Sequence, residues 1–275
     1  MAYTHDWYVF PKSIEHEFKY KGKYGAKGEK RAKREKPTPE QIRRQNMTNR
    51  IIHYRRMIKL NFGKGDLWLC FKYPARYRPT VDEVKDDFKK VRDAIRAKYR
   101  KAGEEFRYIY RMEVGAKGGI HIHMIANRIE NAETLINTEW EKVLRKRELS
   151  RTEGLVDFKY IYDSGGYHDL AKYICKDYEK DSEEYEQLSM FTKCEVKSLI
   201  MVQSSRNLKK PEKQTKECRH WTMRKMIMEG PKPTPGYYID KDSIIQGINP
   251  YTGMSYLRYT EIKDPYYKPP EGEFL

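Results

Sequence analysis

The chain has 275 residues, of which 38% are hydrophobic and 35% are charged, and this suits one large domain or one domain with appendages. It contains no run of about 18 apolar residues, and its first residues lack an apolar signal core, so we expect a cytoplasmic protein with no membrane partner. The formal net charge of +16 at pH 7 favours a polyanionic partner, above all nucleic acid. No CxxC pair occurs among the four cysteines, which argues against a zinc ribbon or a disulfide framework.

Residues 1–60 are expected to form a basic arm followed by a helix. Residues 19–59 hold 15 Lys and Arg against three Glu, and the glycine- and lysine-rich composition of residues 1–37 predicts an irregular arm. Thr38 and Gln41 then form a capping box that begins a helix. The arginines of this helix suit either packing or phosphate contact. We assign four of them to nucleic-acid binding: Arg43, Arg44, Arg55 and Arg56.

Residues 61–185 carry the periodic segments of a core domain. They predict a strand, a helix, two strands, a helix, a strand and a helix, over residues 66–73, 80–103, 106–114, 119–126, 132–144, 155–162 and 166–180. Thr80 and Glu83 form a second capping box at the first of these helices. This order predicts an α+β fold with a ferredoxin-like, or RRM-like, antiparallel sheet that has its helices on one face and its other face free.

Two histidines lie close together on one of these strands. Because side chains alternate along a strand, His121 and His123 share the free face of the sheet. A three-residue loop within GAKGG closes the hairpin, and this register pairs Glu113 with His121 and Arg111 with His123. Two imidazoles and a carboxylate on an open face suit a catalytic Mn²⁺, Mg²⁺ or Zn²⁺ ion, whereas the alternative is a pair of histidines hydrated at the surface.

The last predicted helix of the core offers a nucleophile. Tyr167 falls on the apolar stripe of residues 166–180, whereas Tyr173 lies off this stripe, three residues before Lys176. An ammonium group beside a phenol eases its deprotonation or steadies a phosphate. The alternative is a surface tyrosine next to a lysine, and Tyr167 is kept as the second candidate nucleophile.

Residues 186–275 are expected to form a β-rich C-terminal extension that can pack on the core. Its strand-like pieces cover residues 195–203, 236–245 and 254–262. The basic stretch SSRNLKK at residues 204–210 suits either phosphate contact or a solvated loop. Within it we assign three residues to nucleic-acid binding: Arg206, Lys209 and Lys210.

Three segments together resemble the motifs of the HUH (His-hydrophobic-His) endonucleases: LWLCFKYP at 67–74, EVGAKGGIHIHMI at 113–125 and YICK at 173–176. The resemblance is strongest to the rolling-circle replication initiators, the Rep proteins of small single-stranded DNA phages, viruses and plasmids. It implies an RRM-like fold, a Mg²⁺ or Mn²⁺ ion and a bacterial host. It also implies nicking and rejoining of single-stranded DNA at an origin through a 5′-phosphotyrosine intermediate.

The resemblance assigns roles by position. It gives the metal ligands His121, His123 and Glu113, the nucleophile Tyr173 and its accompanying lysine Lys176. Arg111 and Lys72, which share this face of the sheet, are expected to contact the DNA. Asp169 stands where some family members carry a second tyrosine.

The expected partners are an origin in single-stranded DNA, which can be a hairpin, and a host helicase and polymerase. The helicase is expected because no GxxxxGK[ST] segment occurs in the chain. Three alternatives stay open: a transposase or relaxase of the same type, a non-catalytic RRM-like nucleic-acid-binding module, and a zinc hydrolase that uses water in place of Tyr173. The binding module would need stacking aromatics on the open face, and the aromatics of residues 106–114 are expected on the helix side.

Overall fold

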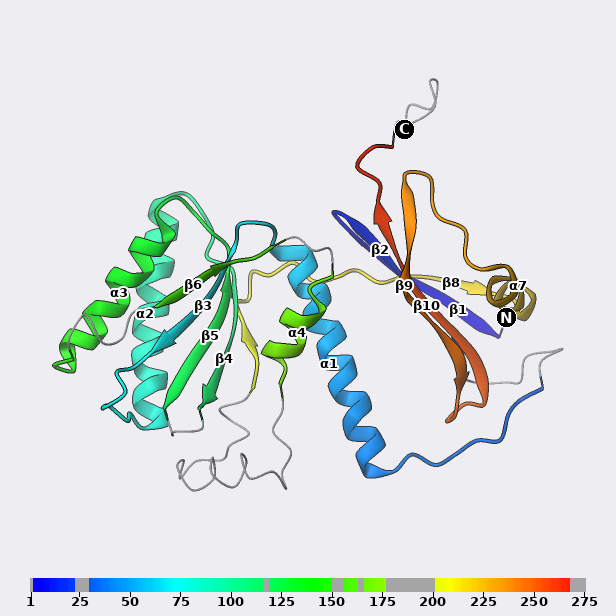
Figure 1. Ribbon diagram of the computed structural model, residues 1–275, viewed down its shortest axis with the longest axis horizontal. Helices are drawn as coiled ribbons and strands as arrows, with labels where there is room; N and C mark the ends of the chain where they lie inside the picture. Colours follow the sequence, from blue (N-terminus) through cyan, green and yellow to red (C-terminus); the bar gives the residue numbers. More distant parts are fainter. Residues whose placement is uncertain are drawn as a thin grey trace. The chain divides into compact units, whose positions relative to one another are not determined.

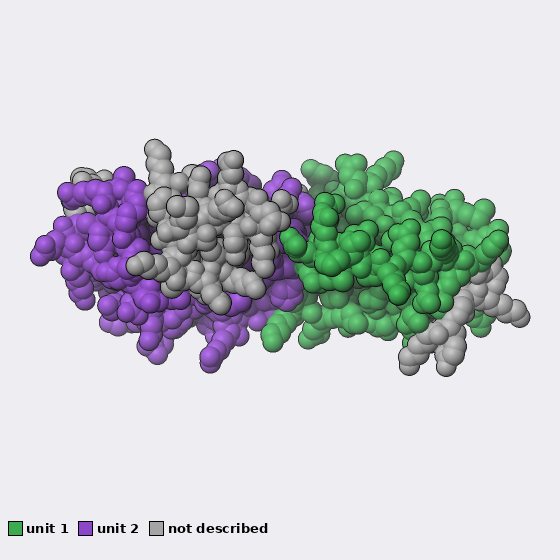
Figure 2. Space-filling model, turned by 90° about the horizontal axis from the view of Figure 1, so that it is seen from below, with its two compact units in different colours: residues 1–46, 210–275 green, residues 47–209 purple. Residues whose placement is uncertain are grey.

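The computed structural model describes residues 2–22, 30–115, 119–149, 156–162, 166–176 and 201–267. The chain divides into two compact units, residues 47–209 and residues 1–46 with 210–275 (Figure 2). These bounds differ from the three segments expected from the sequence, because strands near both ends of the chain share one sheet. Each unit contains one five-stranded sheet.

The unit of residues 47–209 contains the predicted α+β core. Its strands pair in the order β6-β3-β5-β4-β7, and all four pairings are antiparallel. The strands are β3 (Leu67–Lys72), β4 (Tyr108–Val114), β5 (Ile120–Ala126), β6 (Asp157–Tyr160) and β7 (Gln203–Ser204). Helices α2 (Val81–Lys101) and α3 (Ala132–Lys146) cover one face of this sheet (Figure 1). The predicted ferredoxin-like order of elements is thereby confirmed.

The helix-covered face is closed by large apolar side chains. Leu69, Phe71 and Ile122 from the sheet meet Phe88 of α2 and Trp140 of α3, and all five are at most 1% exposed. The alternation of the strands therefore places their apolar positions against α2 and α3 as predicted. Burial on this scale supplies most of the favourable free energy of folding.

Both predicted capping boxes are present. The Glu83 amide donates to Thr80 Oγ1 at 3.3 Å, and Glu83 Oε2 accepts from the Thr80 amide at 2.7 Å. The Gln41 amide likewise donates to Thr38 Oγ1 at 3.2 Å, at the start of α1 (Pro39–Asn61). These are local rules of helix initiation, so the sequence alone could specify them.

The second face of the sheet is not entirely free, and here the prediction was wrong. The C-terminal part of α1 and the short helix α4 (His168–Ile174) pack over Ile109 and Ile125, which are fully buried (Figure 1). These two isoleucines face each other across β4 and β5 on the same side as the histidines. An apolar pair at this position favours a cover, so only the end of the face near His121 and His123 stays open.

The unit of residues 1–46 and 210–275 is built on a second antiparallel sheet, in the order β8-β1-β2-β10-β9. Its strands are β1 (Tyr3–Phe10), β2 (Ser13–Tyr20), β8 (Gln214–Cys218), β9 (Tyr237–Asn249) and β10 (Met254–Lys263). Helix α7 (His220–Glu229) packs on one face through the buried side chain of Met223. The β-rich C-terminal extension is confirmed.

The irregular arm expected at residues 1–37 is wrong for its first half. Tyr3–Phe10 and Ser13–Tyr20 form a hairpin, in which Tyr3 pairs with Tyr20. Tyr3, Phe18 and Tyr20 are buried against residues of β10 and α7, far away in the sequence. Residues 30–37 do lie outside helices and strands, as predicted.

Two smaller expectations concern thiols and membranes. Cys70, Cys175 and Cys218 are free, as expected, and Cys194 lies outside the described residues. Among the residues that the structure describes, no helix is long and apolar enough to cross a membrane.

A test of the fold concerns the end of α3. Arg147 donates to the buried carboxylate of Asp87 at 2.6 Å and to Glu83 at 2.8 Å, so it ties α3 to α2. We expect Arg147→Met to lower the free energy of unfolding by about 2 kcal/mol, because a buried acceptor loses its partner. The measurement is urea unfolding followed by circular dichroism.

The matched control is Arg145→Met, which removes an exposed guanidinium 3.7 Å from Glu141. An exposed pair contributes little, so this variant should stay within about 0.5 kcal/mol of the wild type. Equal losses in the two variants would contradict the proposed tie between α2 and α3.

Candidate active site

The hairpin of β4 and β5 has the register expected from the sequence. Glu113 pairs with His121 and Arg111 pairs with His123. The Gly115 amide donates to the Gly119 carbonyl at 2.8 Å and closes the hairpin, whose loop residues 116–118 lie outside the described residues. Paired residues share a face, so the two histidines and the carboxylate lie on the face opposite α2 and α3.

Strand β3 extends this arrangement on the other side of β5. Lys72 pairs with His121, and Cys70 pairs with His123. Burial raises the pKa of the Cys70 thiol to about 12, so Cys70 is a neutral packing group at this position. Lys72 forms an ion pair with Asp157 of the neighbouring strand β6. The charges that surround the histidines are therefore of both signs.

Tyr173 of α4 reaches into this group of side chains. Its phenol oxygen lies 3.4 Å from Glu113 Oε2 and 3.4 Å from His123 Nε2. Glu113 Oε2 and His123 Nε2 are themselves 3.0 Å apart, so three functional groups converge on one point. The phenol is accessible, because the Tyr173 side chain is 43% exposed. The sequence-based choice of Tyr173 and the hairpin as neighbours agrees with this geometry.

The surroundings keep the phenol of Tyr173 protonated. Burial, followed by the negative charge of Glu113, raises its pKa to about 12, and the nearby Arg111 opposes the rise. The sequence predicted easier deprotonation through Lys176, whereas the net effect in the metal-free protein is the reverse. Burial and the neighbouring His123 lower the pKa of His121, which favours its neutral, ligand-competent form.

The fit of these residues to a metal ion is partial. Within the described part of the chain, no group of three or more His, Cys, Asp or Glu side chains is arranged to hold one. His123 and Glu113 already lie side by side, but the His121 ring lies 6.3 Å from that of His123 and close to the backbone of Gly115. The donor set of two imidazoles and a carboxylate suits a divalent cation, provided that His121 adopts another rotamer.

Trp68 is a site residue that the sequence analysis missed. Its ring stacks on His123 at 5.6 Å and meets the edge of the Tyr173 ring at 5.4 Å. The alternation of β3 does place Trp68 on the histidine face, and that was the available signal. Its contact with Tyr173 depends on where α4 lies, which the local pattern does not give. Trp68 therefore limits how the imidazole and the phenol can move.

Arg111 has a different place from the one predicted. Its side chain is fully buried, so it does not present its charge to solvent as a DNA contact would. Its Nη1 donates to the carbonyls of Tyr173 at 3.4 Å and Ile174 at 3.5 Å, and to that of Lys176. These are carbonyls at the C-terminal end of α4, where a cation is favoured. Arg111 thus anchors the helix that carries Tyr173.

The remaining predicted residues are dispersed. Tyr167, the second candidate nucleophile, packs against the apolar cluster of Ile109 and Ile125, as its position on the core stripe predicted. Lys176 is exposed at the end of α4. The other predicted DNA contacts are exposed at Arg43, Arg44, Arg206, Lys209 and Lys210, half-buried at Arg55 and buried at Arg56.

Arg206 belongs to a larger basic surface. It lines a groove of about 900 Å³ together with three arginines of α2, namely Arg92, Arg96 and Arg100. Four guanidinium groups around one groove suit the phosphates of a nucleic acid. The α2 arginines were not predicted, because their spacing on α2 is also that of an ordinary solvated helix face.

Residues 66–178 match the family model of a replication-associated protein, the ORF2 type. The matched span includes the β4–β5 hairpin and Tyr173, and it supports a replication-associated protein of the Rep type. Comparisons with curated proteins and with solved structures gave no match. The match thereby connects the chain with DNA replication, through the unit that carries the candidate active site.

The role of Arg111 can be tested by hydrogen exchange. In Arg111→Met the carbonyls at the end of α4 lose their donor, so we expect amides of residues 171–175 to exchange about tenfold faster or more. Mass spectrometry of the metal-free protein measures this, and the amides of Val84–Ile95 in α2 serve as the internal reference.

Lys172→Met is the matched control, since Lys172 is an exposed cation on the same helix. It should leave the exchange of α4 unchanged. Faster exchange throughout α2 and α4 in Arg111→Met would mean general unfolding, and no change in α4 would contradict the anchor.

A second test concerns the phenol. In the metal-free protein the pKa of Tyr173 should be about 12, and Glu113→Gln should lower it towards 10, because the phenolate no longer faces a negative charge. Carbon-13 NMR of labelled tyrosines follows the titration, and the Tyr173→Phe spectrum assigns the signal. Glu105→Gln, an exposed substitution, should leave the pKa unchanged, and an equal shift in both variants would contradict the assigned cause.

Proposed function

We propose that this chain is a replication initiator that nicks and rejoins single-stranded DNA at an origin, with Tyr173 as its nucleophile. The observation that carries the proposal is the convergence of the Tyr173 phenol with Glu113 and His123, at 3.4 Å from each. The match of this segment to a replication-associated family supports replication over transposition or conjugation.

The proposed reaction is a transesterification. The Tyr173 oxygen attacks a backbone phosphorus of the DNA, a Tyr–O–P bond forms, and the bond from phosphorus to the 3′ oxygen breaks. The phenol proton passes to Glu113 Oε2, the carboxylate oxygen within reach, and the departing 3′ oxygen takes a proton from water. Attack by a free 3′ hydroxyl on the phosphotyrosine reverses these steps, so rejoining requires no nucleotide cofactor.

We further propose that His121, His123 and Glu113 hold a Mg²⁺ or Mn²⁺ ion. Such an ion would polarise the phosphate and favour charge development on the oxygens of the reacting group. Arg111 keeps α4 docked, and Trp68 holds the Tyr173 and His123 rings in contact. The partners that follow are an origin strand and, for unwinding and synthesis, a host helicase and polymerase.

The proposal predicts a covalent protein–DNA adduct. The wild-type chain, incubated with Mn²⁺ and single-stranded DNA of the replicon that encodes it, should form a denaturant-resistant adduct, and Tyr173→Phe should form none. Glu113→Gln should slow adduct formation about 100-fold, because a positioned carboxylate is lost. Chelation of the divalent ion should abolish the reaction.

Tyr167→Phe is the matched control, since it makes the same substitution beside the same helix. It should retain adduct formation. An adduct that persists in Tyr173→Phe and disappears in Tyr167→Phe would move the nucleophile to Tyr167, and strand cleavage without any adduct would favour attack by water.

A further inference from the structure

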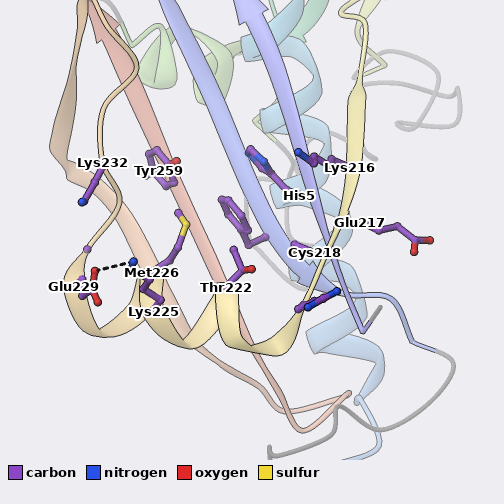
Figure 3. Close-up of a pocket in the computed structure, with 13 residues that line it drawn as sticks. His5, Lys216, Glu217, Cys218, Thr222, Lys225, Met226, Glu229, Lys232 and Tyr259 are labelled. Carbon is purple, nitrogen blue, oxygen red and sulfur yellow. Dashed lines mark ion pairs between the residues drawn. The ribbon is translucent and has the colours of Figure 1, made fainter.

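The unit of residues 1–46 and 210–275 contains a pocket of about 600 Å³ between α7 and the sheet (Figure 3). His5 of β1, Phe18 of β2 and Tyr259 of β10 lie at its sheet side. Register places these three on one face, because His5 pairs with Phe18 and Tyr259 pairs with His16 beside it. This pocket lies outside the segment that matches the replication-associated family.

The sheet side of the pocket is a group of nearly parallel rings. His5 and Phe18 stack at 4.1 Å with an angle of 8° between their planes, and His16 and Tyr259 stack at 4.6 Å with an angle of 13°. Burial, together with His16, lowers the pKa of His5 to about 4, so its ring is neutral at pH 7. A planar heteroaromatic ligand can add to such a stack, and each stacked base contributes about 1–3 kcal/mol.

The rim of the pocket is basic. Lys216, Arg219, Lys225 and Lys232 contribute four cations to its lining, against two carboxylates. Both carboxylates have partners, since Glu217 pairs with Lys21 and Glu229 pairs with Lys225 at 3.8 Å. Within the described ranges, Lys216, Arg219 and Lys232 take part in no ion pair. In Figure 3, Lys216 and Lys232 lie on either side of His5 and Tyr259.

We propose that this pocket binds a nucleotide of single-stranded DNA, with the base against His5, Phe18 and Tyr259 and the flanking phosphates on Lys216, Arg219 and Lys232. Stacking rings and phosphate-binding cations in one pocket match this ligand, whereas duplex DNA keeps its bases inside the helix. The choice of a DNA strand over a free nucleotide rests on the proposed function. The pocket would then give the chain a second hold on the strand, separate from the chemistry at Tyr173.

The first test compares two pairs of lysines. Lys216→Ala with Lys232→Ala should weaken binding of a fluorescent single-stranded oligonucleotide about tenfold, in the full chain at low salt. It should also reduce the slope of log K against log salt by about 0.7 for each lost phosphate contact. Lys241→Ala with Lys263→Ala, two exposed lysines of the same sheet outside the pocket, is the control. Equal affinity and slope in the two double variants would overturn the proposal.

The second test locates the base. A strand that carries 5-iodouracil should photocrosslink to peptides that contain His5, Phe18 or Tyr259, and His5→Ala should reduce this product. Crosslinks found only in the unit of residues 47–209 would overturn the proposal. Displacement of the strand from the pocket by micromolar mononucleotide, or preference for an RNA strand, would overturn the choice of single-stranded DNA.

These outcomes are separable from those for the nicking reaction. Tyr173→Phe should bind and crosslink as the wild type does, although it forms no adduct. The Lys216→Ala and Lys232→Ala double variant should still form the adduct at saturating DNA. Loss of adduct in the double variant at saturation would mean that the pocket is not a separate binding site, and would count against the proposal.

Discussion

The candidate active site depends on one buried cation. Arg111 lies fully buried in the middle of β4 and donates to carbonyls at the end of α4, the helix that carries Tyr173. A buried guanidinium is costly unless its donors are used, and the exposed end of a helix supplies acceptors of the right partial charge. The sheet that presents Glu113 and His123 thereby also determines where the phenol lies.

The alternation of β4 and β5 arranges this face in three steps. Ile109 and Ile125 form an apolar pair under α1 and α4, Arg111 and His123 follow, and Glu113 and His121 form the last pair before the hairpin loop. Apolar packing holds α4 at one end, so its polar residues meet the catalytic candidates at the other. Trp68 connects the two parts, because it packs against the apolar cluster and contacts both His123 and Tyr173.

The sequence predicted those features that local rules determine. Hairpin length gave the register of Glu113 with His121, and capping boxes gave the starts of α1 and α2. The features that it missed depend on distant segments: Arg111 is buried because α4 covers it, and β1 and β2 are strands because β10 and β8 flank them. Basic composition near residue 30 also hid the alternation of Tyr3, His5 and Trp7, which is a strand pattern when considered alone.

The ionisation of Tyr173 constrains any mechanism at this site. With a pKa of about 12, on the order of one phenol in 100,000 is ionised at pH 7, so a preformed phenolate cannot be the main attacking species in the metal-free protein. The same carboxylate that raises the pKa, Glu113, is also within reach to accept the proton as the new bond forms. A cation bound between Glu113 and His123 would offset the negative charge that opposes ionisation. The arrangement therefore suits a nucleophile that is inactive by itself and becomes reactive only when substrate and cation are both present.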